Sequence, residues 1–569
     1  MQMNYEVFSP WAEVDAVVSG GLQPRVTDLN KKTIGLFSFF KEHGPMILRE
    51  VERQLKEKFP EAKFSHFQYP KDCVDIADDE EYQTLLEEWL KGVDTVVSGH
   101  GDATSCTLFL TYNTAWMERL GKPTVILMHK HFENIAQSGS SARGVRGIRI
   151  VKTDILDMSS LFSLEGVVDN IIKPGITAVI DDVIAALTMP ITPEEKDLSK
   201  KEEATSGIVF KGSLQDVNWH FYRNGWTQGL PIIPPTEESV REMLSGTDLP
   251  ADHLIAKIPP MSGKATVEKI AINAVMAGCL PTYLTVLIAA VRALMDYPKL
   301  KLGVALEGYT CSVASWAPLL ILNGPVRNDL HVNSGVAAFS PYSMANNAIG
   351  HALGLILMNI GGLRPGREDM SSIGHEGRNG MCIGENEELN PWEPLHVGKG
   401  LNRDDSTVTL FWPNSRSLLR CGDDPALILR TLCDNIDTFG FNPGCGIFMG
   451  PTVATILSGS GFSKKDVLSY ILEYARKPAG NVNLRWMRGN SHAPKTVPLA
   501  LESTRSVRRI FDPEHLMLII IGEPYHRHVA LYGGGGDHGG PVTQKIELPA
   551  HWSELVNKYR QIVPTYARY

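Results

Sequence analysis

The sequence of 569 residues lacks the patterns that mark several common chemistries. It contains no C-x-x-C pair, HExxH metal motif, Walker phosphate loop or GxGxxG dinucleotide loop. Lysine and arginine form no dense block, and the formal net charge of −9 is spread along the chain. Because nucleic-acid binding needs a basic footprint, we expect no nucleic-acid partner.

Long apolar runs are also missing. The longest one, 284–295, is interrupted by Arg292 and is too short to cross a bilayer. The first residues carry Glu6, Glu13 and Asp15 and lack the basic start and apolar stretch of a secretory signal. The eight cysteines are scattered, which favours thiols over a disulfide framework. These features predict a cytoplasmic protein without a membrane partner.

The first third of the chain alternates strand-like and helix-like segments. Short apolar stretches typical of strands alternate with amphipathic stretches typical of helices, including 45–59, 79–92 and 104–120. Such alternation predicts an α/β fold with a parallel, Rossmann-like sheet over residues 1–190. In sheets of this kind, ligands bind at the carboxyl ends of the strands.

The rest of the chain differs from the first third in its composition and in its pattern of apolar residues. We expect a charged linker at 191–212, because the stretch around it contains proline and few apolar residues. Residues 213–400 are dense in glycine, proline and asparagine and predict a module of helices joined by long polar loops. Residues 401–569 regain an alternating pattern and predict a second α/β unit. The large C-terminal part would thus be a Gly-rich α/β module.

The stretch SGHGDATSCT, residues 98–107, places Cys106 where a predicted strand passes into a predicted helix. A helix N-terminus stabilises an anion, so a cysteine in the first turn tends toward a lowered pKa and a reactive thiolate. We expect Asp102 to cap the helix, and Gly101 to allow the close approach of a substrate.

Neighbouring side chains could complete a site around the thiol. Ser105, Thr107 and the backbone amides could bind an oxyanion or a carboxylate, and His100 is near enough in sequence to act as a base. A buried cysteine that only fills the core fits the same position, because cysteine is among the most buried residue types. Position alone therefore leaves both interpretations of Cys106 open.

The segment GHGDATSCT…AWMERLGKPTVIL resembles the UGSC family of selenoproteins and their cysteine homologues over roughly residues 30–190. That family carries selenocysteine-Gly-Ser-Cys-Thr after a glycine-rich turn. Its signature is similar to the selenocysteine segment in the B components of glycine-reductase-type enzymes, in which selenium attacks a carbon and expels an amine. The resemblance implies chemistry at a carbon–sulfur or carbon–nitrogen bond, with Cys106 at the site.

The sequence departs from that family pattern at the selenocysteine. Ala103 stands at the selenocysteine position and Thr104 at the glycine position, so only 105–107 match. One sulfur suits nucleophilic catalysis, acid/base work or metal ligation better than disulfide chemistry within the motif. The second half, roughly 215–560, resembles a long module found beside UGSC domains, which implies no particular reaction.

Polar clusters in the second half offer further candidate residues. The loop HEGRNGMCIGENEE brings together His375, Cys382, Glu385 and Asn386 and predicts an acid/base pair, a divalent-metal site or a solvated acidic turn. Asn323 and Arg327 suit carboxylate or amide recognition, and equally suit ordinary turn chemistry. His526 and His528 would face the same side of a strand, so together with Cys382 they are candidate metal ligands.

These observations favour an enzyme that acts on a small polar metabolite. Cys106 would be the nucleophile or thiol acid/base, with Glu385 or His375 protonating the leaving group. The cofactor is unknown: the site needs none or a divalent metal. A metal-dependent lyase or hydrolase centred on the C-terminal half and a non-catalytic binding subunit are the alternatives. The apolar helices of the middle module make a homo-oligomer plausible.

Overall fold

A computed structural model describes residues 4–563 apart from 16–20, 40, 42, 72–73, 156–165, 197–206, 297–305, 341, 437–443, 479–505, 511 and 535–539. Much of the predicted linker therefore lies outside the described residues. Within these ranges, none of the helices has the length and apolar character needed to cross a membrane.

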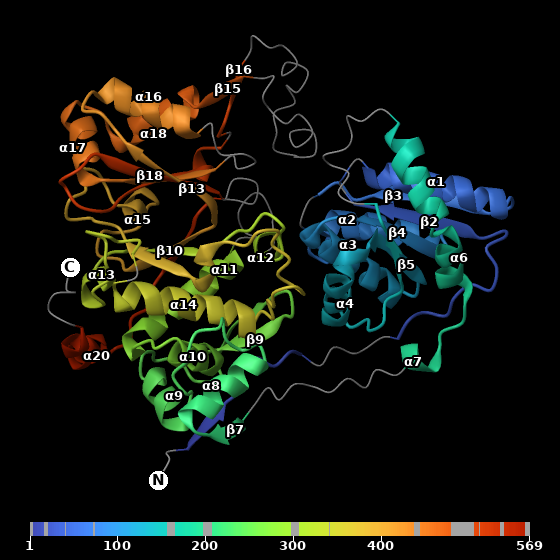
Figure 1. Cartoon of the computed structure of the whole chain (residues 1–569), viewed down its shortest axis with the longest axis horizontal. Coiled ribbons are helices and arrows are strands. Elements are labelled where there is room, and N and C mark those ends of the chain that lie inside the picture. The colour runs from blue at the N-terminus through green and yellow to red at the C-terminus, as the bar shows by residue number, and fades with distance from the viewer. Residues whose placement is uncertain are drawn as a thin grey trace.

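The N-terminal unit, residues 22–188, is a parallel sheet covered by helices (Figure 1, blue and teal). Its strands are β2 (Thr33–Ser38), β3 (Lys63–Gln68), β4 (Thr95–Gly101), β5 (Thr124–His129) and β6 (Ile150–Thr153). Its helices are α1 (His43–Lys58), α2 (Glu80–Lys91), α3 (Thr104–Arg119), α4 (Glu133–Ala142), α5 (Lys173–Thr177) and α6 (Ile180–Thr188), and α7 (Pro193–Lys196) follows. The predicted Rossmann-like α/β fold is confirmed.

The strand order of this sheet is β3-β2-β4-β5-β6, and all neighbouring strands are parallel. The chain moves outward from β2 to β3 and then returns to the other side of β2 with β4. Helix α1 packs with α5 and α6 on one face of the sheet, whereas α3 packs with α4 on the other. The carboxyl ends of β2 and β4 therefore flank a topological switch point, which is where ligands bind in such sheets.

Helix α3 is buried on nearly all sides, because it lies between its own sheet and the rest of the protein. The hydroxyl of Tyr112 donates to the carbonyl oxygen of Pro260 at 3.4 Å and to Glu307 Oε1 at 3.2 Å. The apolar pattern of α3 thus reflects two packing partners, one on each side. The helix that carries Cys106 is held by both parts of the chain.

Strand β1 (Tyr5–Phe8) does not join the N-terminal sheet. It pairs antiparallel with β7 (Ile208–Gly212), at the far end of the larger body. The backbone of Phe8 also donates to the carbonyl of Pro235. The first residues of the chain therefore pack against the larger body, which follows the predicted linker in the sequence. They were predicted to belong to the N-terminal domain, residues 1–190.

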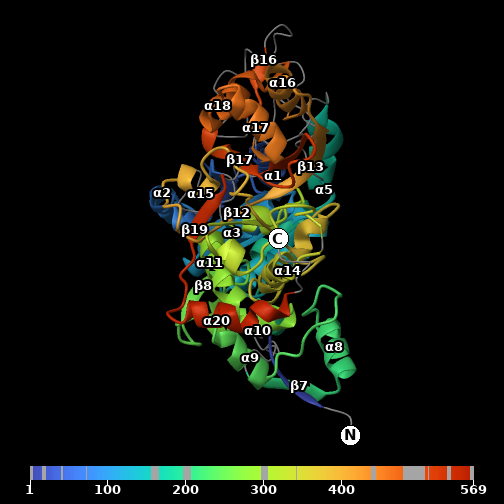
Figure 2. The same cartoon turned by 90° about the vertical axis from the view of Figure 1, so that its left-hand side faces the viewer.

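The larger body begins at β7 and contains most of the helices (Figures 1 and 2). They are α8 (Leu214–Arg223), α9 (Glu237–Leu244), α10 (Val267–Met276), α11 (Leu284–Asp296), α12 (Glu307–Thr310), α13 (Val326–Asp329), α14 (Met344–Asn359), α15 (Leu395–Gly398), α16 (Pro425–Ile436), α17 (Pro451–Gly459), α18 (Lys464–Tyr474) and α20 (Trp552–Tyr559).

Two four-stranded sheets form the centre of this body. The first has the order β11-β10-β12-β19, with β10 (Leu319–Asn323), β11 (Met381–Gly384), β12 (Thr407–Phe411) and β19 (Val542–Lys545). The second has the order β13-β18-β14-β17, with β13 (Pro413–Arg420), β14 (Cys445–Met449), β17 (Leu516–Ile520) and β18 (His528–Gly534). Three short pairs complete the list: β8 (Leu254–Ile258) with β9 (Gly263–Thr266), β15 (Arg476–Pro478) with β16 (Ser506–Arg508), and β1 with β7.

The two sheets pack face to face between two layers of helices. Ile321, Phe411, Phe448 and Ile519 belong to one buried cluster between the sheets. The outer face of the first sheet packs on α11, and α16 and α18 share the buried cluster on the outer face of the second. The first sheet crosses the boundary expected at residue 400, because β12 pairs with β10.

Candidate functional site

Charged and polar side chains of the N-terminal unit gather at the carboxyl edge of its parallel sheet. They come from the carboxyl ends of four strands: the segment after β2 contributes two, the end of β4 two, and β5 and β6 one each. They are Lys41, His43, His100, Asp102, His129 and Thr153. The charges of Lys41, His43, Asp102 and His129 all alter the pKa of His100, so these groups lie close together.

Asp102 is the centre of this cluster. Its carboxylate accepts from Lys41 Nζ at 2.6 Å and lies 2.6 Å from His43 Nε2, and its side chain is fully buried. Burial alone would raise the pKa of Asp102, but Lys41 and His43 outweigh burial and hold that pKa well below its usual range. The prediction that Asp102 caps α3 is wrong: Ala103 precedes the helix without a side-chain cap, and the carboxylate binds Lys41 and His43 instead.

His100 lies beside Asp102 but has a different environment. Its Nε2 is 2.8 Å from Thr153 Oγ1 at the end of β6, and its ring is buried. Burial is the main reason that the pKa of His100 falls to about 3, with further lowering by His43 and His129. The ring is therefore neutral at pH 7.

Cys106 is the third residue of α3, in the first turn of the helix. Cys106 is 8% exposed, so a small part of its surface reaches solvent. The first amides of a helix find no carbonyl partner within that helix, and their dipoles favour an anion. Gly101 is needed just before this turn, because a Cβ there would lie 2.8 Å from Thr107 Oγ1 and 3.0 Å from the Cβ of Met128.

Several buried polar atoms around this turn have no hydrogen-bond partner among the described residues. They are Ser98 Oγ, His100 Nδ1, Thr104 Oγ1 and Thr107 Oγ1. Each residue is at most 3% exposed. Burial of an unpaired polar atom costs roughly 1–3 kcal/mol, so such a group of atoms at one strand–helix junction indicates a place for a polar ligand. Ser105, at 9% exposure, lies in the same turn.

The predicted residues Asn323, Arg327, Glu385 and Asn386 come together in the larger body. Asn323 Nδ2 donates to Glu385 Oε2 at 2.6 Å, and Arg327 Nη1 donates to the carbonyl oxygen of Glu385 at 2.8 Å. Asn386 Nδ2 donates to the carbonyl oxygen of Gly522 at 3.0 Å. Burial raises the pKa of Glu385. These polar groups bind one another and fix the loop after β11.

The other candidates of the larger body line two cavities. His375 and Cys382 line a cavity of about 430 Å³, and His526 and His528 line an adjoining cavity of about 220 Å³. Among the described residues, the hydrogen bonds of His375 and Glu385 are with residues of the larger body and not with the Cys106 turn. In the described part of the chain, no group of three or more His, Cys, Asp or Glu side chains is arranged to hold a metal ion.

Sequence reasoning missed Lys41, His43 and His129. His129 ends β5, whereas Lys41 lies in the segment between β2 and α1 and His43 is the first residue of α1. The carboxyl ends of parallel strands lie at the same edge of a sheet. Polar residues after β2 and β4 were therefore the feature of the sequence from which the cluster could have been predicted. That prediction required the strand order, which a single sequence does not state.

The chain was compared with known families and proteins. A search of curated proteins found no match. Residues 6–162 match the model of the UGSC family, and this range contains the five-stranded sheet, the Cys106 turn and all of β1 except its first residue. The N-terminal part of the chain is therefore similar to the UGSC family.

Proposed function

We propose that the protein is a thiol-dependent enzyme that makes or breaks a carbon–sulfur or carbon–nitrogen bond in a small polar metabolite. Cys106 is its nucleophile. The observation that carries this proposal is the gathering of Lys41, His43, His100 and Asp102 at the same sheet edge as the first turn of α3. Nucleophilic catalysis at a thiol needs groups of differing charge nearby, and two of these groups, His100 and Asp102, have a strongly lowered pKa.

The same edge suits recognition of a carboxylate. Helices α1 and α3 both begin at the switch point, and a Cβ at Gly44 would lie 3.3 Å from the carbonyl oxygen of Gly99. The positive ends of two helix dipoles therefore lie close together, and the ammonium group of Lys41 balances the charge of Asp102 beside them. The unpartnered hydroxyls of Ser98 and Thr104 would donate to the same carboxylate.

His43 is the proton carrier in this proposal, in place of His100. An imidazole held by a buried, ionised carboxylate is the arrangement used by general bases, and His43 has this arrangement with Asp102. A pKa of about 3 leaves His100 too weak a base at neutral pH. His100 instead orients the substrate through Nδ1, while Thr153 holds Nε2.

The reaction then proceeds in two balanced steps. His43 takes the thiol proton of Cys106, and the thiolate forms a bond to an electrophilic carbon. The bond from that carbon to an amine or thiolate breaks, the electron pair leaves with this group, and His43 returns the proton to it. In the second step, water or a small thiol gives its proton to His43 and attacks the same carbon. The Cys106 sulfur leaves with the bonding pair and regains the proton.

Lys41→Gln tests carboxylate recognition with two alkylating agents of nearly equal size, anionic iodoacetate and neutral iodoacetamide. We expect Lys41→Gln to slow the reaction of Cys106 with iodoacetate about tenfold more than that with iodoacetamide. The reason is that the variant leaves the charge of Asp102 without its cation. The rates are measured by mass spectrometry of the Cys106 peptide.

Lys130→Gln is the matched control, because Lys130 lies at the same sheet edge but pairs with Asp154 and is half exposed. It should leave the ratio of the two rates unchanged. Equal slowing of both reagents in Lys41→Gln would contradict carboxylate recognition, because a loosened structure alone affects both reagents alike.

A further inference from the structure

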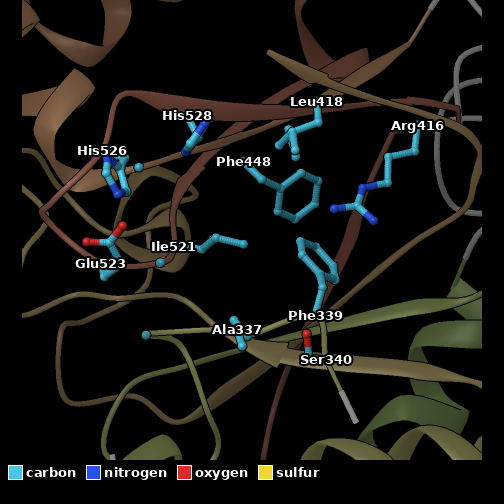
Figure 3. A pocket seen from close by; sticks show the side chains of 15 residues that line it. Ala337, Phe339, Ser340, Arg416, Leu418, Phe448, Ile521, Glu523, His526 and His528 are labelled. Atoms are coloured by element: carbon cyan, nitrogen blue, oxygen red, sulfur yellow. The ribbon is translucent and has the colours of Figure 1, made fainter. Parts of the chain in front are cut away.

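The smaller cavity of the larger body lies far from the Cys106 turn in the chain and has the features of a separate binding site. It has a volume of about 220 Å³ and lies between the second sheet and the loop 335–340 (Figure 3). Phe339, Phe448 and Ile521 form its apolar part, Arg416 stands at one end, and His526 and His528 stand at the other. The cavity adjoins the larger one at Arg416, Phe339 and Ser340.

Arg416 offers its charge to both cavities. The side chain projects from β13, and its guanidinium lies 5.8 Å from the centre of the Phe339 ring and 5.7 Å from that of Tyr532. Aromatic faces hold a guanidinium in place without neutralising it. Within the ranges that the structure describes, no carboxylate forms an ion pair with Arg416. The planar guanidinium can therefore bind a carboxylate through two parallel hydrogen bonds.

Three aromatic rings pack together beside Arg416: Phe339 and Phe448 line the smaller cavity, and Tyr532 lines the larger one. The ring centres of Phe339 and Phe448 are 5.3 Å apart, those of Phe448 and Tyr532 5.0 Å, and those of Phe339 and Tyr532 5.1 Å. Phe448 and Tyr532 are at most 4% exposed, so their positions are fixed by the packing between the sheets. A cavity wall of such rings favours a flat apolar group, because ring–ring contacts add to the burial of apolar area.

The opposite end of the cavity is polar. Gly450 lines the cavity and directly precedes α17, so this helix begins at the cavity wall. A Cβ at Gly450 would lie 2.9 Å from the carbonyl oxygen of His528, which leaves room for glycine alone. The carboxylate of Glu523 accepts from the backbone amide of Tyr525. The imidazoles of His526 and His528, with ring centres 5.7 Å apart, remain to bind a polar substituent.

We propose that this cavity binds a small aromatic carboxylate, with the carboxylate on Arg416 and the ring against Phe339 and Phe448. A volume of about 220 Å³ accepts a one-ring acid, and the adjoining cavity leaves space beyond Arg416 for a substituent. A single arginine matches the charge and planarity of one carboxylate, and an aliphatic acid would leave the aromatic wall without a partner. The site is independent of the chemistry proposed for Cys106.

The test measures binding of 4-fluorobenzoate to the full-length protein by fluorine NMR. We expect a dissociation constant of roughly millimolar or tighter, as is normal for so small a ligand. Arg416→Gln should weaken binding at least about tenfold, because it removes the charged hydrogen bonds. Arg420→Gln is the matched control: Arg420 is an exposed arginine on the same strand and lines neither cavity.

Three further measurements make the outcome unambiguous. Neutral 4-fluorobenzamide should bind at least tenfold more weakly than the acid. Acetate should fail to displace the probe at equal concentration, and Cys106→Ser should leave binding unchanged. The proposal is overturned if 4-fluorobenzoate does not bind, if Arg416→Gln and Arg420→Gln behave alike, or if acetate or inorganic phosphate competes as well as benzoate does.

Discussion

Replacing Glu118 by alanine is expected to lower the free energy of unfolding of the N-terminal unit by about 3–5 kcal/mol. Glu118 forms an ion pair with Arg25 at 2.6 Å, and both side chains are fully buried. The same carboxylate accepts from the backbone amides of Gln23 at 2.8 Å and Thr124 at 2.7 Å. Removing it leaves a buried cation, the buried amide of Thr124 and the partly buried amide of Gln23 without their acceptor.

The effect should reach the Cys106 turn, because Glu118 lies near the end of the same helix. It ties α3 to the start of β5 and to the segment before β2. Unfolding is followed in urea by pulsed hydrogen exchange, read in peptides from β4 and α3. This readout isolates the N-terminal unit within a chain that has more than one folded body.

Two comparisons give the Glu118 result its meaning. Glu88→Ala should change the unfolding free energy by less than about 0.5 kcal/mol, since Glu88 pairs with Lys91 on the surface of α2. Arg25→Met combined with Glu118→Gln should be more stable than Glu118→Ala, because no unpaired cation remains. If Glu118→Ala were no more destabilising than Glu88→Ala, the buried pair would not hold α3.

The N-terminal unit is also expected to lose about 1.6 kcal/mol of stability as the pH falls from 6.5 to 5, through His100 alone. The pKa of His100 is about 3 in the folded state, and an unfolded histidine titrates at about 6.5. Between these values the unfolded chain binds a proton that the folded chain does not. Stability from this group is therefore complete only well above pH 6.5, and it declines as the pH falls through 6.5 toward the folded pKa of about 3.

His100→Gln should remove this part of the pH dependence, because glutamine does not titrate. His66→Gln is the control: His66 is a partly exposed histidine on β3 and lies 2.6 Å from Glu52. The window above pH 5 is chosen because Asp102, with its lowered pKa, contributes to the slope only at lower pH. An unchanged slope in His100→Gln would show that the folded protein protonates this ring.

The local pattern of the sequence predicted the N-terminal sheet well. Helix 104–120 corresponds to α3 (Thr104–Arg119), and the apolar stretch before Cys106 is β4, since each signal is short-range and repeats along the chain. The pairing of β1 with β7 joins residues about 200 apart, and no periodicity within either segment indicates it. For the same reason, β12 was expected in a separate unit although it pairs with β10.

The candidate site was predicted only where it is contiguous in sequence. Cys106, His100 and Asp102 fall within one stretch, so the stretch itself drew attention to them. Lys41 and His43 come from the end of another strand, and only the fold brings them to Asp102. Asp102 was likewise predicted from its local position only. Its place before a helix predicted a helix cap, whereas in the fold its carboxylate binds Lys41 and His43.

The most direct test is the rate at which iodoacetamide alkylates Cys106 as a function of pH, read peptide by peptide. Burial raises the pKa of Cys421 to about 11 and of Cys433 to about 12, and it raises the pKa of four other buried cysteines still further: Cys279, Cys311, Cys382 and Cys445. These six thiols serve as slow internal references. We predict that Cys106 reacts at neutral pH well ahead of all six. Alkylation of Cys106 that is no faster than theirs would contradict its role as the nucleophile.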